Sequence, residues 1–237
     1  MPRLKVKRNI EPKEVVYSND HWELLWFIRT KGEKILECLQ KHGMTGYIYG
    51  SPARGDVHEG SDIDIFIYEK VSSFKIDLAL MECGLSISMK EIVLPTPNET
   101  IKGIFYLSDQ ISITTRLTRF LRKGFDFYKF AGCVNLEQIR KKERVAGVNK
   151  ALVVIEPKEY GHVEYSLIGN EHKAKQILGV DEEIINQRSR VLQKRDKIGR
   201  TGILFSQIFD PEVSLEDELQ KIAKRNNIIR RRIRMSE

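Results

Sequence analysis

The residues from Asp62 to Ile67 constrain the fold of this chain more than any other stretch. Two aspartates, Asp62 and Asp64, alternate with isoleucines in the sequence D-I-D-I-F-I. Successive side chains of a β-strand point to opposite faces of its sheet, so the isoleucines would enter a core while both carboxylates share the other face. Two negative charges this close repel each other unless a divalent cation lies between them. The pattern therefore predicts a half-buried strand that presents a metal-binding pair of aspartates.

A glycine–serine turn precedes this pair by twelve residues, where a predicted strand over 44–49 runs into Gly50 and Ser51. Glycine allows a sharp turn and the close approach of a ligand. Ser51 is expected to cap the helix that follows, with Pro52 as its first residue. The free N–H groups and the dipole of a helix N-terminus favour phosphate, so this turn is a candidate phosphate site.

Together the two elements resemble the signature of the DNA polymerase β-type nucleotidyltransferases. In that signature a hydrophobic-Gly-Ser turn precedes an Asp-x-Asp strand by about ten residues. The fuller form, G-S-P-A-R-G…S-D-I-D, is similar to the minimal nucleotidyltransferases of bacteria and archaea, and the resemblance covers residues 44–94. In the rear half, the stretches R-V-A-G-V-N-K and G-R-T-G are similar to uncharacterised archaeal predicted nucleotidyltransferases.

The resemblance implies a Mg²⁺-dependent enzyme that moves a nucleoside monophosphate from an NTP such as ATP to a hydroxyl group and releases pyrophosphate. It implies two Mg²⁺ ions, held by Asp62, Asp64 and a third carboxylate on a neighbouring strand. The bound nucleotide would contact the residues of the turn and the serine before the aspartates, namely Gly50, Ser51, Arg54 and Ser61.

Two of these assignments have competing interpretations. The third carboxylate is expected to be Glu91, which shares one face of a predicted strand over 85–94 with apolar residues. The alternative is Asp77, on a predicted helix that ends at residue 83 and there an ordinary exposed acid. Arg54 either neutralises phosphate charge or forms a structural ion pair with Asp56 or Glu59.

Charge divides the 237 residues unevenly: residues 1–100 carry a net charge of −2 and residues 101–237 a net charge of +9. A basic rear half predicts contact with a polyanion, although a solvated surface gives the same balance. The three cysteines form no CxxC pair, so neither a disulfide framework nor a zinc knuckle is expected, and the usage predicts a reducing cytoplasm. No apolar run approaches the length of a membrane helix, and the basic N-terminus lacks the apolar stretch of a secretory signal.

The basic residues of the rear half are concentrated in two predicted helical segments. Residues 171–194 resemble a helix-turn-helix around Gly179, although two packed amphipathic helices give the same pattern. A last helix is expected after Ser214, whose spacing from Asp217 is that of a capping box. This helix either follows phosphates or is a solvated basic end. The candidate nucleic-acid-binding residues are Arg188, Arg190, Lys194, Arg195, Arg230, Arg231 and Arg232.

The order of predicted elements indicates an α+β fold. A mixed sheet with helices on one face is expected over residues 1–116, followed by a basic, mainly helical region with some strand over 117–237. Nucleic acid, with RNA as the first candidate, is the expected acceptor. The alternatives are a protein side chain, as in adenylylating antitoxins, a small molecule, or a non-catalytic regulator that binds nucleic acid. Besides those already given, the predicted elements cover 20–39, 72–83, 104–107, 111–115, 117–123, 151–155 and, as a wing or a strand, 199–205.

Overall fold

The computed structural model describes the chain except for residues 1–4, 9–10, 98, 120–123, 200–201 and 236–237. It contains two compact units, each assembled from three segments of the chain. The first unit contains residues 1–31, 48–61 and 125–201, and the second contains 32–47, 62–124 and 202–237. These units cut across the expected division at residue 116, because the long helix α1 (Asn19–Lys41) and the strand β2 (Gly46–Tyr49) each contribute to both.

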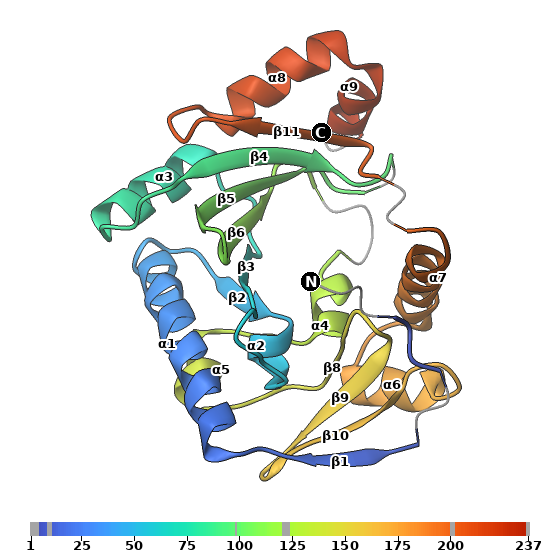
Figure 1. Ribbon diagram of the computed structural model, residues 1–237. Coiled ribbons are helices and arrows are strands. Elements are labelled where there is room, and N and C mark those ends of the chain that lie inside the picture. The colour runs from blue at the N-terminus through green and yellow to red at the C-terminus, as the bar shows by residue number, and fades with distance from the viewer. Residues whose placement is uncertain (1–4, 9–10, 98, 120–123, 200–201, 236–237) are drawn as a thin grey trace. The chain divides into compact units, whose positions relative to one another are not determined.

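The first unit is built on a four-stranded antiparallel sheet with the order β1-β10-β9-β8 (Figure 1). Its strands are β1 (Lys13–Val16), β8 (Gly147–Val148), β9 (Val153–Lys158) and β10 (Gly161–Ser166). A separate short strand, β7 (Cys133–Val134), pairs with the end of β2. The helices are α2 (Ser51–Arg54), α4 (Asp126–Ala131), α5 (Leu136–Arg140), α6 (Glu171–Leu178) and α7 (Glu182–Ile198).

The core of this unit explains the spacing of apolar residues around Gly179. Leu178, Val180 and Ile185 are buried in one cluster with Val154 of β9 and Tyr165 of β10. Gly179 ends α6 in the left-handed region, at φ 58° and ψ 38°, which glycine adopts readily. The helices α6 and α7 therefore bury their apolar sides in the core of the first unit.

The second unit is built on a mixed sheet with the order β11-β4-β5-β6-β3-β2-β7, of which β7 and the end of β2 belong to the first unit (Figure 1). The strand β3 is parallel to β6, whereas the pairs β11–β4, β4–β5 and β5–β6 are antiparallel. Its further strands are β3 (Ile63–Ile67), β4 (Met89–Leu94), β5 (Lys102–Ser108), β6 (Ile111–Arg116) and β11 (Phe205–Phe209). Its helices, besides the end of α1, are α3 (Ser73–Glu82), α8 (Leu215–Arg225) and α9 (Asn227–Arg234).

Helices cover one face of this sheet. In α3, Ser73 donates its backbone N–H and its hydroxyl to the carboxylate of Glu216 in α8, at 2.8 and 2.5 Å. A Cβ atom on Gly103 of β5 would lie 2.6 Å from a methyl group of Leu215, so a larger residue there would force the Leu215 side chain to move. Ile65 and Phe105 belong to the covered face and are fully buried. The acidic face of β3 is therefore the face opposite to these helices, as expected.

The ends of the last two helices follow capping signals in the sequence. Ser214 accepts a hydrogen bond from the Asp217 N–H at 3.2 Å, which confirms the predicted start of α8. The prediction of a single last helix is wrong, because the segment forms two helices. Asn226 ends α8, and its side chain accepts hydrogen bonds from the N–H groups of Ile228 and Ile229 at the start of α9. Of the stretch over 199–205, residues 200–201 lie outside the described residues, and Phe205 begins the strand that pairs with β4. Part of the helix expected over 117–123 lies outside the described residues.

Two of the three cysteines form a disulfide, contrary to the expectation from their spacing. Cys38 of α1 is bonded to Cys83, which follows α3, and their Cα atoms are 6.1 Å apart. Spacing along the chain did not indicate this pair because the fold, rather than a local motif, brings the two helix ends together. Cys133 is free. In the part of the chain that the structure describes, no helix combines the length and the apolar character that crossing a bilayer requires.

Candidate active site

The aspartate pair lies at the start of β3. Asp62 immediately precedes the strand and is exposed, whereas Asp64 lies within it and is half-buried. Asp64 is directly opposite Ser112 of β6, and the Ser112 hydroxyl donates a hydrogen bond of 2.7 Å to its carboxylate. Ile63 and Ile65 point to the other face and are buried. The strand thus fixes one carboxylate through its neighbour and leaves the other open to solvent.

These oxygens suit a magnesium ion that also binds substrate. Mg²⁺ in nucleotide-binding enzymes is held by one or two carboxylates together with phosphate oxygens and water. Asp62 and Asp64 supply such a hard, oxygen-only donor set, and the exposure of Asp62 leaves room for the remaining ligands. Ser112 orients Asp64 as the hydrogen-bonded neighbours of metal-binding carboxylates do.

Glu91 does not join the aspartate pair, and its assignment as the third carboxylate is wrong. It lies on the same face of the sheet, but its strand β4 is separated from β3 by β5 and β6. Three steps between strands amount to about 14 Å, far more than the separation of two ligands of one ion. Its carboxylate instead accepts the hydroxyls of Tyr106 at 2.6 Å and Ser206 at 2.5 Å. Burial, followed by the contact with Glu91, raises the pKa of Tyr106.

Asp77 is also excluded from the pair, because it lies on the opposite face. It lies on α3, as expected, and forms an ion pair of 2.8 Å with Lys90. Lys90 is next to Glu91 on β4, so the two side chains point to opposite faces of the sheet. The side chain of Lys90 is completely buried, so Asp77 is the counter-ion of a buried lysine rather than an ordinary exposed acid. Burial raises the pKa of Asp77, and Lys90 opposes that shift.

Sequence reasoning missed Ser112. The segment I-S-I-T-T around it alternates as β3 does, and this was the available signal. The predicted hairpin strand is present as β6. Its parallel pairing with β3, however, depends on the order of strands in the sheet, which the local pattern does not show. That order places Ser112, rather than an acid, beside Asp64.

The glycine–serine turn lies between β2 and α2, as predicted, but the N-cap of α2 is Gly50 rather than Ser51. Gly50 is the N-cap of α2, with φ 88° and ψ −147°, and no side chain caps this helix. Ser51 is therefore the first helical residue rather than the cap, and its hydroxyl donates to Ser61 at 3.2 Å. The Ser61 hydroxyl in turn accepts the N–H of His58 at 2.9 Å. Within the first unit, the turn and the residue that precedes Asp62 in the chain are thus hydrogen-bonded to each other.

Replacing Gly50 by alanine is expected to lower the free energy of unfolding by about 2–3 kcal/mol, because its backbone angles are close to a region that glycine almost alone adopts. No heavy atom of the described residues lies within 4 Å of the Cβ position, so the cost comes from the backbone. Gly179→Ala is the control, since its αL angles cost alanine about 1 kcal/mol. Urea unfolding measures both, and equal losses would contradict the explanation.

Arg54 is the centre of a structural network, so its assignment as a phosphate clamp is wrong. Its Nε and Nη2 donate to the two carboxylate oxygens of Asp56 at 2.9 and 3.0 Å. Its Nη1 donates to the carbonyl oxygen of Ala131 at 2.6 Å. The side chain is buried, and a Cβ atom on Gly132 would lie 2.8 Å from its Cγ. The pairing with Asp56 is the structural alternative that the sequence left open.

The basic residues of α7 differ in exposure. Arg190, Lys194 and Arg195 are exposed, and the first two are four residues apart on one side of the helix. Arg188 is half-buried, with its guanidinium carbon 4.7 Å from the ring centre of Phe127. Three of the four candidates are therefore accessible to a polyanion.

The basic residues of α9 also divide into two kinds. Arg231 is exposed and Arg230 is half-buried. Arg232 is 1% exposed and donates to the carbonyl oxygens of Glu99 and Arg119, at 2.7 and 2.6 Å. Arg232 therefore holds α9 to the backbone at Glu99 and Arg119, within the second unit. Its assignment to a nucleic-acid-binding surface is wrong.

Comparison with known families agrees with the motif. Residues 31–205 match the model of the nucleotidyltransferase domain, which is most of the chain and includes both the turn and the aspartate pair. Neither the comparison with curated proteins nor the comparison with solved structures gave a match. The chain belongs to the nucleotidyltransferase domain family and is a nucleotidyltransferase, an enzyme that transfers a nucleoside monophosphate from an NTP.

Proposed function

We propose that this nucleotidyltransferase is Mg²⁺-dependent and that its acceptor is a hydroxyl group of a nucleic acid. The observation that carries the magnesium requirement is the pair of carboxylates at the start of β3, one exposed and one oriented by Ser112. The observation that favours a polyanionic acceptor is the group of exposed cations on α7, within a rear half of net charge +9.

The chain's own residues have separate tasks in this proposal. Asp62 and Asp64 hold the metal, and Ser112 keeps the Asp64 carboxylate in one orientation. Gly50 and Ser51 form the phosphate-binding turn, which the hydrogen bond from Ser51 to Ser61 holds in place. Mg²⁺ bound by the aspartates would neutralise phosphate charge and lower the pKa of the attacking hydroxyl. In-line displacement at the α-phosphorus then depends mainly on positioning and electrostatics.

Because neither Glu91 nor Asp77 lies beside the aspartate pair, the protein ligands proposed for the metal are two carboxylates rather than three. Two carboxylates bind Mg²⁺ with phosphate and water as the remaining ligands, so the proposal needs no third acid. We therefore retain Asp62 and Asp64 as the metal ligands and do not assign three acids to two ions.

Label transfer tests the function. The protein is incubated with Mg²⁺, each of the four NTPs labelled at the α-phosphate in turn, and a cell lysate as acceptor. We expect label in a product that nuclease destroys and that protease leaves intact, and a chain carrying Asp62→Ala and Asp64→Ala should form none. Label destroyed by protease would show a protein acceptor, and label in small molecules a metabolite. Label that persists in the variant, or no label at all, would contradict the proposal.

Replacing Ser112 by alanine is expected to reduce Mg²⁺ affinity during transfer by about 10–100-fold, the effect of losing a hydrogen bond that orients a metal ligand. The activity should recover at high Mg²⁺ concentration. Ser112→Thr keeps the hydroxyl and suits a strand, so it should restore the normal dependence. A loss of activity that extra Mg²⁺ does not relieve, or that Ser112→Thr shares, would contradict a positioning role.

A further inference from the structure

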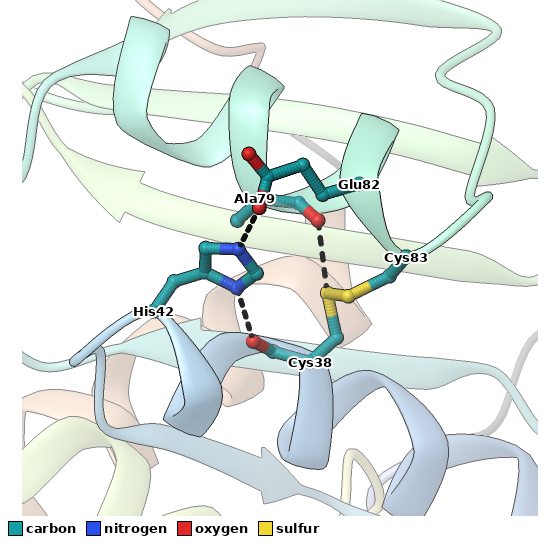
Figure 2. Close-up of a disulfide and its surroundings, with 5 residues drawn as sticks. All are labelled: Cys38, His42, Ala79, Glu82 and Cys83. Atoms are coloured by element: carbon teal, nitrogen blue, oxygen red, sulfur yellow. Dashed lines mark hydrogen bonds and ion pairs between the residues drawn. A yellow bond between two sulfur atoms is a disulfide. The ribbon is translucent and has the colours of Figure 1, made fainter.

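Three metal-ligating side chains meet where α1 ends and α3 ends, apart from the aspartate pair. Cys38 lies in the last turn of α1 and His42 directly follows the helix, with its ring 2.8 Å from the carbonyl oxygen of Cys38. Cys83 follows α3 and lies against them (Figure 2). One ligand atom from each of these three residues lies within 4.8 Å of the other two. It is the one such group of three among the described residues.

The hydrogen bonds of His42 suit a metal ligand. Its Nδ1 is 2.8 Å from the carbonyl oxygen of Cys38, and its Nε2 is 2.7 Å from a carboxylate oxygen of Glu82 (Figure 2). Metal-binding histidines usually donate one ring N–H to a carbonyl or carboxylate, which fixes the ring and leaves the other nitrogen for the metal. Here the backbone carbonyl takes Nδ1. Nε2 is then the ligand nitrogen, and a metal ion there would replace its present contact of 2.7 Å with the Glu82 carboxylate, which would remain beside the ion.

We propose that the reduced chain binds one zinc ion through the sulfurs of Cys38 and Cys83 and Nε2 of His42, with Glu82 or water as the fourth ligand. Thiolate and imidazole ligands favour zinc over the magnesium that carboxylates select. Zn–S and Zn–N bonds of about 2.3 and 2.0–2.1 Å place the ligands of a tetrahedral site about 3.5–3.8 Å apart. The three ligand atoms already lie within 4.8 Å of one another, so zinc binding requires that the disulfide opens and that Nε2 of His42 exchanges Glu82 for the metal.

The disulfide and the zinc site are alternative states of the same sulfur atoms. Zinc needs two thiolates, so it binds only while the bond between Cys38 and Cys83 is open. A low-molecular-weight disulfide such as oxidised glutathione supplies the oxidant. The two cysteine sulfurs form their S–S bond, the S–S bond of glutathione breaks, two protons yield two molecules of reduced glutathione, and zinc leaves. The site therefore responds to the thiol–disulfide balance.

Cobalt titration tests the site in the full chain, reduced with a phosphine and freed of metal. We expect one equivalent of Co²⁺ to give the visible bands of tetrahedral cobalt and the near-ultraviolet charge-transfer absorption of thiolate ligands. One equivalent of Zn²⁺ should abolish both. Co²⁺ at Asp62 and Asp64 would give no thiolate absorption, so the aspartates do not interfere. Oxidised glutathione should release the metal, measured with a chromophoric chelator.

Cys133→Ser is the matched control, because Cys133 is free and burial raises the pKa of its thiol to about 11. It should bind Co²⁺ as the unchanged chain does. Cys38→Ser, Cys83→Ser and His42→Ala should each weaken binding by more than about 100-fold, the upper end of the loss that a missing second-shell partner causes. Absent charge-transfer absorption in the reduced chain, or full affinity in any of these three variants, would overturn the proposal. Circular dichroism confirms that each variant is folded. The outcome is independent of nucleotidyl transfer.

Discussion

Replacing Asp64 by asparagine is expected to lower kcat/KM for nucleotidyl transfer by at least about 10²–10³-fold, the loss that follows removal of one group stabilising charge in the transition state. The amide has the shape of the carboxylate and can still accept the hydrogen bond from Ser112, so the strand pairing should survive. The amide is neutral, however, and holds Mg²⁺ poorly. Steady-state transfer of the α-phosphate label measures the effect, and urea unfolding should show nearly unchanged stability.

Asp217→Asn is the control for this experiment. Asp217 is an exposed acid in the first turn of α8, the helix that packs on the other face of the same sheet. The substitution removes one negative charge from the second unit without touching β3, so transfer should be unchanged. If Asp64→Asn retained more than a tenth of the activity, Asp64 would not be a metal ligand of the reaction.

Patterns that depend on near neighbours in the chain predicted the structure well. Alternation of Asp64 with isoleucines correctly predicted both the strand and its two faces, because a strand's period of two is local. The cap at Ser214 was equally local. These features need no knowledge of which strands pair.

Errors arose where the outcome depends on strand order or distant partners. The pattern around Glu91 correctly indicated a strand and a face, yet β5 and β6 lie between it and the aspartates. Arg54 and Arg232 were assigned to ligands because arginine commonly binds phosphate, but both donate to backbone carbonyls supplied by remote segments. Such carbonyls belong to every residue and leave no mark in a sequence. The bond from Cys38 to Cys83 was missed for the same reason.

The ion pair between Asp77 and Lys90 should be worth far more than its distance suggests. Asp77→Ala is expected to lower the free energy of unfolding by about 2–4 kcal/mol, because it leaves a fully buried ammonium group without its counter-ion. Lys90 would keep its hydrogen bond of 2.8 Å to the carbonyl oxygen of Val213 and its position 5.5 Å from the ring centre of Phe105. The estimate lies slightly below that for a fully buried pair because the Asp77 side chain is 29% exposed.

Two further variants separate burial from simple attraction. Lys141 and Glu137 are closer, at 2.6 Å, but both are exposed, so Glu137→Ala should leave stability nearly unchanged. Lys90→Met removes the buried charge and fills its space, and Asp77 can then turn to water, so this variant should cost less than Asp77→Ala. Urea unfolding of the three chains gives the comparison. If Lys90→Met lowered the free energy of unfolding most, the lysine would stabilise the fold by a contact other than its ion pair. Equal losses of stability for Asp77→Ala and Glu137→Ala would show that burial of Lys90 has no part in the effect.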